Sequence, residues 1–248
     1  MTVTDAPTST KDAADLRLVK RAWARLDRPS TADGLAAKGR EVPGTLIIAG
    51  IAMAIALVAT YWSWRQGWLH MYTDAITHST IARRVLDSQN TGFQQLGTVW
   101  LPMPHVLLMP FVFFFPLYQS GLAGGLLGAM CMAVCAGAIW RITYRSGFGR
   151  PARLIAVAVF VLNPSILYLF TTALTESVLI ASLLASLAGL SGWITAMPAI
   201  SPGELAVFAG IPATIAVLSR YEGWAFVAVG VVFVIIASWR RWRSKSYT

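Results

Sequence analysis

The sequence predicts an all-α membrane protein, with about six transmembrane helices and further juxtamembrane helices on the outer face. Hydrophobic residues make up 56% of the 248 residues and charged residues only 12%, where a soluble domain carries about a quarter charged residues. Several apolar stretches approach about 20 residues, the length that a helix needs to cross a hydrocarbon core of about 30 Å. Unpaired backbone groups are too costly in lipid for an open sheet, so these stretches are expected to be helices.

Lys and Arg account for the net charge of +9, and they cluster in the segments that flank the apolar stretches. In a membrane protein this placement reports topology, so no nucleic-acid partner is expected. Cys131 and Cys135 lie one helical turn apart within an apolar run. A disulfide between them would distort the helix, so both are expected to be small buried thiols.

The chain divides into a basic tail over residues 1–43, a membrane body over residues 44–239 and a basic end over residues 240–248. Residues 16–26 of the tail carry apolar side chains at helical spacing between basic ones. An interfacial helix on anionic lipid and a disordered tail both fit that pattern. A polar first outer loop is expected over residues 65–120.

The proline-rich segment 102–117 decides the number of crossings. A full crossing would place the basic loop 141–153 on the side opposite the basic tail, against the positive-inside rule. A segment that dips into the outer interface leaves every basic segment in the cytoplasm. We therefore expect a multi-pass protein of the cell membrane with both termini cytoplasmic. The expected spans are 44–64, 121–140, 152–171, 177–196, 204–219 and 223–239.

With this topology, ionisable side chains gather at the extracytoplasmic end of the membrane body: His70, Asp74, His78, Asp87, His105, Glu176, Arg220 and Glu222. Such groups cost about 2.5 to 3.5 kcal/mol at the centre of a membrane helix, so a one-sided cluster indicates a site. Asp74 and His78 are four residues apart and share one face of a helix. Arg83 and Arg84 are either phosphate ligands or interfacial arginines that reach lipid headgroups.

Two sets of residues carry a family pattern. The first comprises Asp74-Ala75, His78, Ile81–Val85, Asp87-Ser88 and Gln95–His105. The second comprises Asn163-Pro164, Leu167-Tyr168, Thr175-Glu176 and Arg220–Trp224. Together they resemble C-type membrane glycosyltransferases (GT-C), the group related to the polyprenyl-phosphate-sugar-dependent mannosyltransferases. The resemblance covers residues 44–239.

The resemblance implies a sugar donor attached to a polyprenyl phosphate and a catalytic aspartate in the first outer loop. Asp74 matches that aspartate, and Glu176 falls where relatives often carry a second acid. An acceptor hydroxyl would attack the anomeric carbon with inversion, with Asp74 as general base and cationic groups on the leaving phosphate. The phosphate candidates are Arg220 first, then Arg83, Arg84, His78 and His105, with Glu222 and Tyr221 in support. No metal site is predicted, although a divalent cation on Asp74 and Glu176 stays open.

Relatives of this group usually continue with further spans and often a soluble outer domain. The resemblance therefore implies an N-terminal GT-C module that either is completed by a second membrane polypeptide, which we favour, or is a shortened, inactive homologue. Two other functions stay open. A transporter or lipid-flipping subunit would use a helix broken at Asn163-Pro164. A non-catalytic assembly subunit would use its arginines and aromatic residues to bind lipid or a partner helix.

Overall fold

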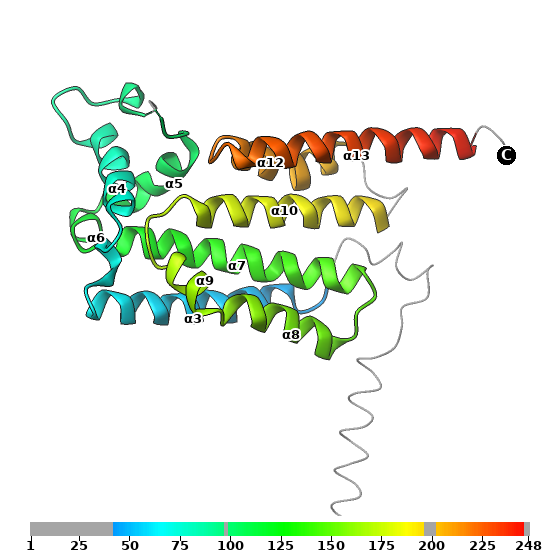
Figure 1. Cartoon of the computed structure of the whole chain (residues 1–248), viewed down its shortest axis with the longest axis horizontal. Coiled ribbons are helices and arrows are strands. Elements are labelled where there is room, and N and C mark those ends of the chain that lie inside the picture. The colour runs from blue at the N-terminus through cyan, green and yellow to red at the C-terminus, as the bar shows by residue number, and fades with distance from the viewer. Residues whose placement is uncertain (1–41, 97–98, 196–201, 246–248) are drawn as a thin grey trace, which may run out of the picture.

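The structure is a computed structural model that describes residues 42–96, 99–195 and 202–245. Every regular element in these ranges is a helix. This confirms the all-α prediction, and four of the helices are long and apolar enough to cross a membrane, as a membrane protein requires. These are α3 (Thr45–Arg65), α7 (Leu122–Arg145), α10 (Glu176–Thr195) and α13 (Glu222–Lys245). They follow a common axis, with α3 running opposite to the other three (Figure 1).

Two shorter returns connect these helices. The first consists of α8 (Arg150–Val161) and α9 (Pro164–Leu169), and it leads from α7 back toward the start of α10. The second consists of α11 (Pro202–Leu205), a π-helical turn (Ala206–Gly210) and α12 (Ile211–Val217), and it leads to α13. Four of the six predicted spans thus correspond to long helices. The count of six crossings stays a prediction.

The first return is interrupted where the sequence predicts a continuous span over residues 152–171. Asn163 leaves the helical conformation, and its side chain accepts hydrogen bonds from the backbone N–H groups of Ser165 and Ile166. Pro164 follows at the first position of α9, where the missing N–H costs nothing. An N-cap therefore starts a new helix at this point. The predicted span over residues 204–219 corresponds to one continuous apolar helix, Pro202–Val217, which contains the π-helical turn.

Helix α7 is the centre of the packing, and it contacts α3, α8 and α10. A Cβ atom added to Gly128 would lie 1.8 Å from the carbonyl oxygen of Phe170, and one on Gly125 would lie 2.2 Å from Cγ2 of Thr60. Because they lack a side chain, these glycines let neighbouring segments approach α7 closely. They belong to two small-xxx-small pairs in the sequence, Gly121 with Gly125 and Gly124 with Gly128, a pattern that favours such close approach. The thiols of Cys131 and Cys135 are free and buried in the same helix, which confirms that prediction.

One end of the bundle carries the helices α4 (Thr73–Leu86), α5 (Met103–Val112) and α6 (Phe115–Ser120) (Figure 1). We call this region the cap. The proline-rich segment forms two short helices here and not one long crossing helix. The backbone N–H of Met103 donates to the carbonyl oxygen of Leu218 at 3.0 Å, which ties the cap to the end of α12.

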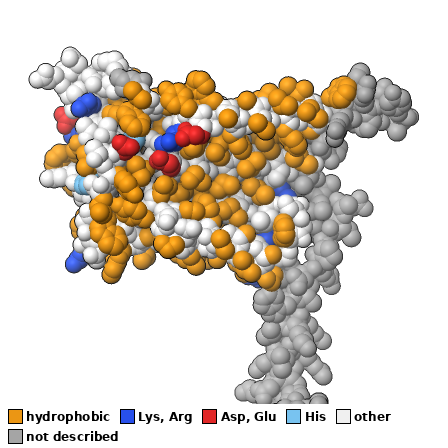
Figure 2. All heavy atoms as spheres, viewed as in Figure 1, with side chains coloured by type: hydrophobic (Ala, Val, Ile, Leu, Met, Phe, Trp, Pro, Cys, Tyr) orange, Lys and Arg blue, Asp and Glu red, His pale blue; other side chains and the backbone are white. Residues whose placement is uncertain are grey.

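The surface between the two ends of the bundle is largely apolar, and acidic and basic side chains gather close to the cap on the face shown in Figure 2. Arginines of α7 and α8 lie at the other end of the bundle. Residues 16–26, for which the sequence leaves an interfacial helix and a disordered tail open, lie outside the described residues.

Candidate functional site

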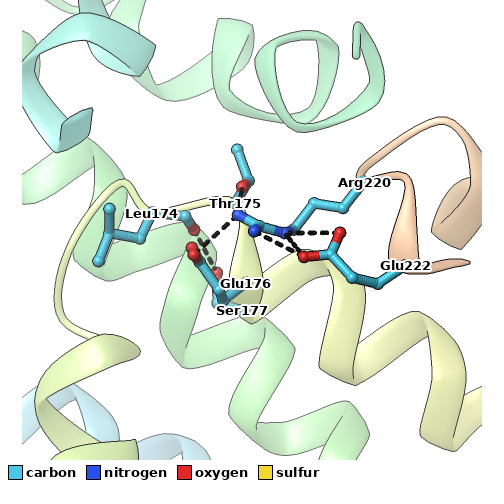
Figure 3. A network of polar contacts seen from close by, with 6 residues as sticks. All are labelled: Leu174, Thr175, Glu176, Ser177, Arg220 and Glu222. Carbon is cyan, nitrogen blue, oxygen red and sulfur yellow. Dashed lines mark hydrogen bonds and ion pairs between the residues drawn. The ribbon is translucent and has the colours of Figure 1, made fainter. Parts of the chain in front are cut away.

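The guanidinium of Arg220 joins the starts of two long helices (Figure 3). Its Nη1 donates to Oε1 of Glu176 at 2.8 Å and to Oγ1 of Thr175 at 3.1 Å. Its Nη2 donates to Oε1 of Glu222 at 2.8 Å, and its Nε lies 3.3 Å from both oxygens of that carboxylate. One cation therefore bridges the segment before α10 and the segment before α13.

The two acids of this bridge occupy the first turns of their helices, Glu176 in α10 and Glu222 in α13. The N-terminal end of a helix carries partial positive charge, which favours a carboxylate there. The hydrogen bonds that Arg220 donates to Glu222 are the largest cause of the raised pKa of Arg220, and the charges of Glu176 and Asp74 raise that pKa further. The side chain of Arg220 is 28% exposed, so solvent still reaches the guanidinium.

Two buried histidines pair within the cap. Nδ1 of His78 in α4 lies 3.0 Å from Nε2 of His105 in α5. The two residues are 2% and 0% exposed, and burial lowers the pKa of each imidazole to about 4. Both rings are therefore neutral near pH 7, and one N–H donates to the other ring. The edge of Trp100 packs against His78, with 4.6 Å between ring centroids.

Asp74 lies exposed in the first turn of α4, one helical turn before His78. Burial is the largest cause of the lowered pKa of His78. The charge of Asp74 raises this pKa, and the charge of Arg220 lowers it. The electrostatic effects of Asp74 on both Arg220 and His78 place these three residues in one neighbourhood. The structure thus brings together Asp74, His78, His105, Glu176, Arg220 and Glu222 from the predicted set.

Arg83 has other contacts. Its Nη1 donates to the carbonyl oxygens of Val112 and Phe113, at 2.8 and 2.9 Å, and its Nη2 forms an ion pair of 2.6 Å with Asp87. The last carbonyls of a helix have no partner within it and favour a cation, so this side chain caps the end of α5. The structure does not bring Arg83 onto the Arg220 bridge.

The remaining predicted residues lie at the surface of the cap end. Arg84 is exposed on α4. Tyr221 is exposed as well, and its ring packs edge-on against Trp224 with 5.4 Å between centroids. Its hydroxyl lies 3.5 Å from the carbonyl oxygen of Val99, a long contact that connects α13 weakly to the cap.

Carboxylates outnumber cations in this neighbourhood. Asp74, Glu176 and Glu222 accompany the single guanidinium of Arg220, while the two imidazoles are neutral. Among the described residues, no three His, Cys, Asp or Glu side chains converge as a group that could hold a metal ion. A phosphate could bind the Nε and Nη2 edge of Arg220 with two parallel hydrogen bonds only if the carboxylate of Glu222 left that edge. Glu222 is the more accessible of the two acids, because its side chain is 59% exposed, against 33% for Glu176.

One hollow lies at the Arg220 bridge, and a second lies beside the connection that leads to α4. A pocket of about 280 Å³ has Arg220 in its wall, together with Trp100 of the cap and Thr175. A larger groove of about 1090 Å³ lies between α3, α9 and the connection to α4. Apolar side chains dominate its wall, which extends from Ala54 within α3 to Tyr72. The groove therefore runs from the apolar body of the bundle to a point two residues before Asp74.

Thr175 and Trp100 contact the site, but sequence reasoning assigned no role to either. Both belong to the stretches that carry the family resemblance. The position of Thr175 directly before Glu176 was the only local signal for its contact with Arg220. Comparison of the chain with protein-family models, curated proteins and solved structures gives no match.

Proposed function

We propose that this chain is a membrane glycosyltransferase of the GT-C type, or the catalytic half of a split one. It transfers a sugar from a polyprenyl-phosphate donor to an acceptor hydroxyl on the extracytoplasmic face. One observation carries the proposal: Arg220 bridges Glu176 and Glu222 at the cap end of the bundle, within the electrostatic reach of Asp74. An acid beside a partly exposed guanidinium suits a reaction that removes a proton and releases a phosphate.

The apolar groove supports a lipid-linked donor. Its wall belongs to helices of the membrane body, and its end reaches Tyr72 near Asp74. A polyprenyl chain in the groove would bring its phosphate to the cap end. The phosphate would then displace the carboxylate of Glu222 from the Nε and Nη2 edge of Arg220, because that edge offers two parallel donors. Glu176 and Thr175 would keep the Nη1 side in place.

The reaction is a single displacement. The acceptor oxygen forms a bond to the anomeric carbon while its proton passes to the carboxylate of Asp74. The bond between the anomeric carbon and the phosphate oxygen breaks, and the electron pair leaves with the lipid phosphate. Arg220 stabilises the charge that develops on this oxygen. Attack opposite the leaving group inverts the anomeric centre.

The topology of the proposal has six crossings, with the interrupted α8–α9 return and the shorter helix Pro202–Val217 counted as spans. The cap lies outside and both termini lie in the cytoplasm, as the arginine loop between α7 and α8 favours. A second membrane polypeptide supplies further helices and part of the acceptor site.

The interrupted α8–α9 return favours a lipid-flipping subunit as the second candidate function, since transporters bind substrates at broken helices. A non-catalytic assembly subunit is the third candidate function.

Asp74→Asn tests the proposal in membranes that also contain any natural partner. We expect sugar transfer from a polyprenyl-phosphate sugar to fall by about 10² to 10⁴ fold, the contribution of a general base. Asp87→Asn is the matched control, since it removes a carboxylate at the other end of α4. Transfer at the wild-type rate by Asp74→Asn would eliminate this residue as the base. Lipid translocation without transfer by the wild-type chain would favour the flipping subunit.

A further inference from the structure

The end of the bundle opposite the cap carries a second polar site within the membrane body. Arg141 and Arg145 lie one turn apart at the end of α7, and they line a hollow of about 160 Å³ together with Glu204 of α11. Arg145 is only 8% exposed, and its Nη1 donates to the carbonyl oxygen of Ala188 and to Oγ of Ser191 at 3.0 Å. The guanidinium of Arg145 is thus held against α10.

An apolar crevice continues from this hollow toward the middle of the bundle. It has a volume of about 330 Å³ and lies between α3, α7, α10 and the π-helical turn. Small and apolar side chains such as Ala49, Ala133 and Val134 form its wall. The hollow and the crevice share three residues, Arg141, Gly189 and Phe208. The two spaces therefore adjoin, with cations at one end and hydrocarbon along the other.

We propose that this combined space binds an anionic phospholipid from the leaflet at that end of the bundle. The headgroup phosphate contacts Arg141 and Arg145, and one acyl chain lies in the crevice. Two guanidinium groups against the single carboxylate of Glu204 leave the hollow net positive. Arg141 lies one turn before the end of a membrane helix, where a guanidinium reaches headgroup depth. Anionic headgroups attract basic side chains at such positions.

A lipid fits the space better than a soluble anion does. The crevice adds apolar contact that only a hydrocarbon chain would use, and it opens within helices that are apolar enough to lie in a bilayer. The site is at the opposite end from the proposed catalytic site, so it does not depend on the transferase proposal.

Lipid binding to the purified full chain in detergent tests this inference by native mass spectrometry. We expect phosphatidylglycerol to bind about tenfold more tightly than phosphatidylcholine with the same chains, because the choline cation offsets the phosphate charge that the net-positive hollow attracts. Glycerol phosphate, which has the headgroup chemistry but no chains, should not bind at the same concentration. Equal binding of the two phospholipids, or tight binding of glycerol phosphate, would overturn the proposal.

Four variants locate the site. Arg141→Gln should remove the preference for phosphatidylglycerol, while Arg65→Gln removes an equal charge at the exposed end of α3 next to the cap and should leave it unchanged. Val134→Phe should weaken the binding of both phospholipids, because the phenyl ring fills the crevice from a partly exposed position. Glu204→Gln should strengthen the binding of phosphatidylglycerol, a gain that damage to the fold cannot produce. An unchanged preference in Arg141→Gln or a loss in Glu204→Gln would contradict the assignment.

Discussion

His78 and His105 share a hydrogen bond of 3.0 Å between Nδ1 and Nε2, although 27 residues separate them in the chain. The bond joins α4 to α5, and His78 lies one helical turn after the exposed Asp74 in α4. Because both rings are buried and neutral, the pair contributes a rigid support and no fixed charge. The position of the proposed base therefore depends on two side chains that solvent does not reach.

The histidine pair predicts that stability decreases in mild acid. The folded protein holds each pKa near 4, whereas an unfolded histidine titrates near 6.5. The unfolded state therefore binds more protons between these values, so stability is complete above about pH 6.5 and falls as pH decreases toward 4. The full effect is on the order of 3 kcal/mol for each imidazole. Thermal unfolding in detergent from pH 7.5 to pH 5 measures it.

His105→Gln is the control for this pH dependence. It keeps a hydrogen-bonding side chain next to His78 but removes one titrating ring, so the midpoint temperature should vary less with pH than in the wild-type chain. An equally steep pH dependence in the variant would assign the effect to the carboxylates and not to the histidines.

The charge balance at Arg220 predicts a gain of donor affinity in Glu222→Gln. The proposed phosphate competes with this carboxylate for the Nε and Nη2 edge, and a neutral amide is a weaker competitor. The KM for the lipid-phosphate donor should fall several-fold, by about 1 kcal/mol of binding free energy. Asp87→Asn serves as a control for the loss of negative charge. A higher KM in Glu222→Gln would show that Glu222 supports donor binding.

The close packing of α7 predicts that Gly128→Ala destabilises the protein strongly. The new Cβ would meet the backbone oxygen of Phe170, which cannot move aside as a side chain could. We expect a loss of about 1 to 3 kcal/mol, the usual cost of overpacking. Gly50→Ala is the matched control, because nothing lies within 4 Å of its added Cβ in α3. Thermal unfolding measures the midpoint temperature of each variant. Equal midpoint temperatures would argue against the close approach of Phe170 to α7.

The contacts of Arg83 predict a structural effect where the sequence suggested phosphate binding. Arg83→Gln leaves the carbonyl oxygens of Val112 and Phe113 without their cation, so stability should fall by about 1 to 2 kcal/mol. Amide hydrogen exchange in α5 should become faster. Arg84→Gln, on the exposed neighbouring position, should change neither quantity. Normal stability with weakened donor binding in Arg83→Gln would restore the phosphate role.

The sequence by itself determined the four long helices, because the free energy of placing a helix in lipid depends on the local run of apolar residues. It also determined the close packing of α7, since small residues four positions apart always share a face. The break at Asn163-Pro164 was visible as a dipeptide, but the predicted span ran through it.

Only the tertiary structure decided which charged groups meet. Arg83 and Arg220 have the same chemistry, yet one caps α5 and the other bridges Glu176 and Glu222, because their partners come from segments far apart in the chain. The apolar groove beside Tyr72 and the arginine hollow near Glu204 depend on the same long-range packing. Local patterns determine which segments leave water, whereas the geometry of a site depends on how those segments pack against one another.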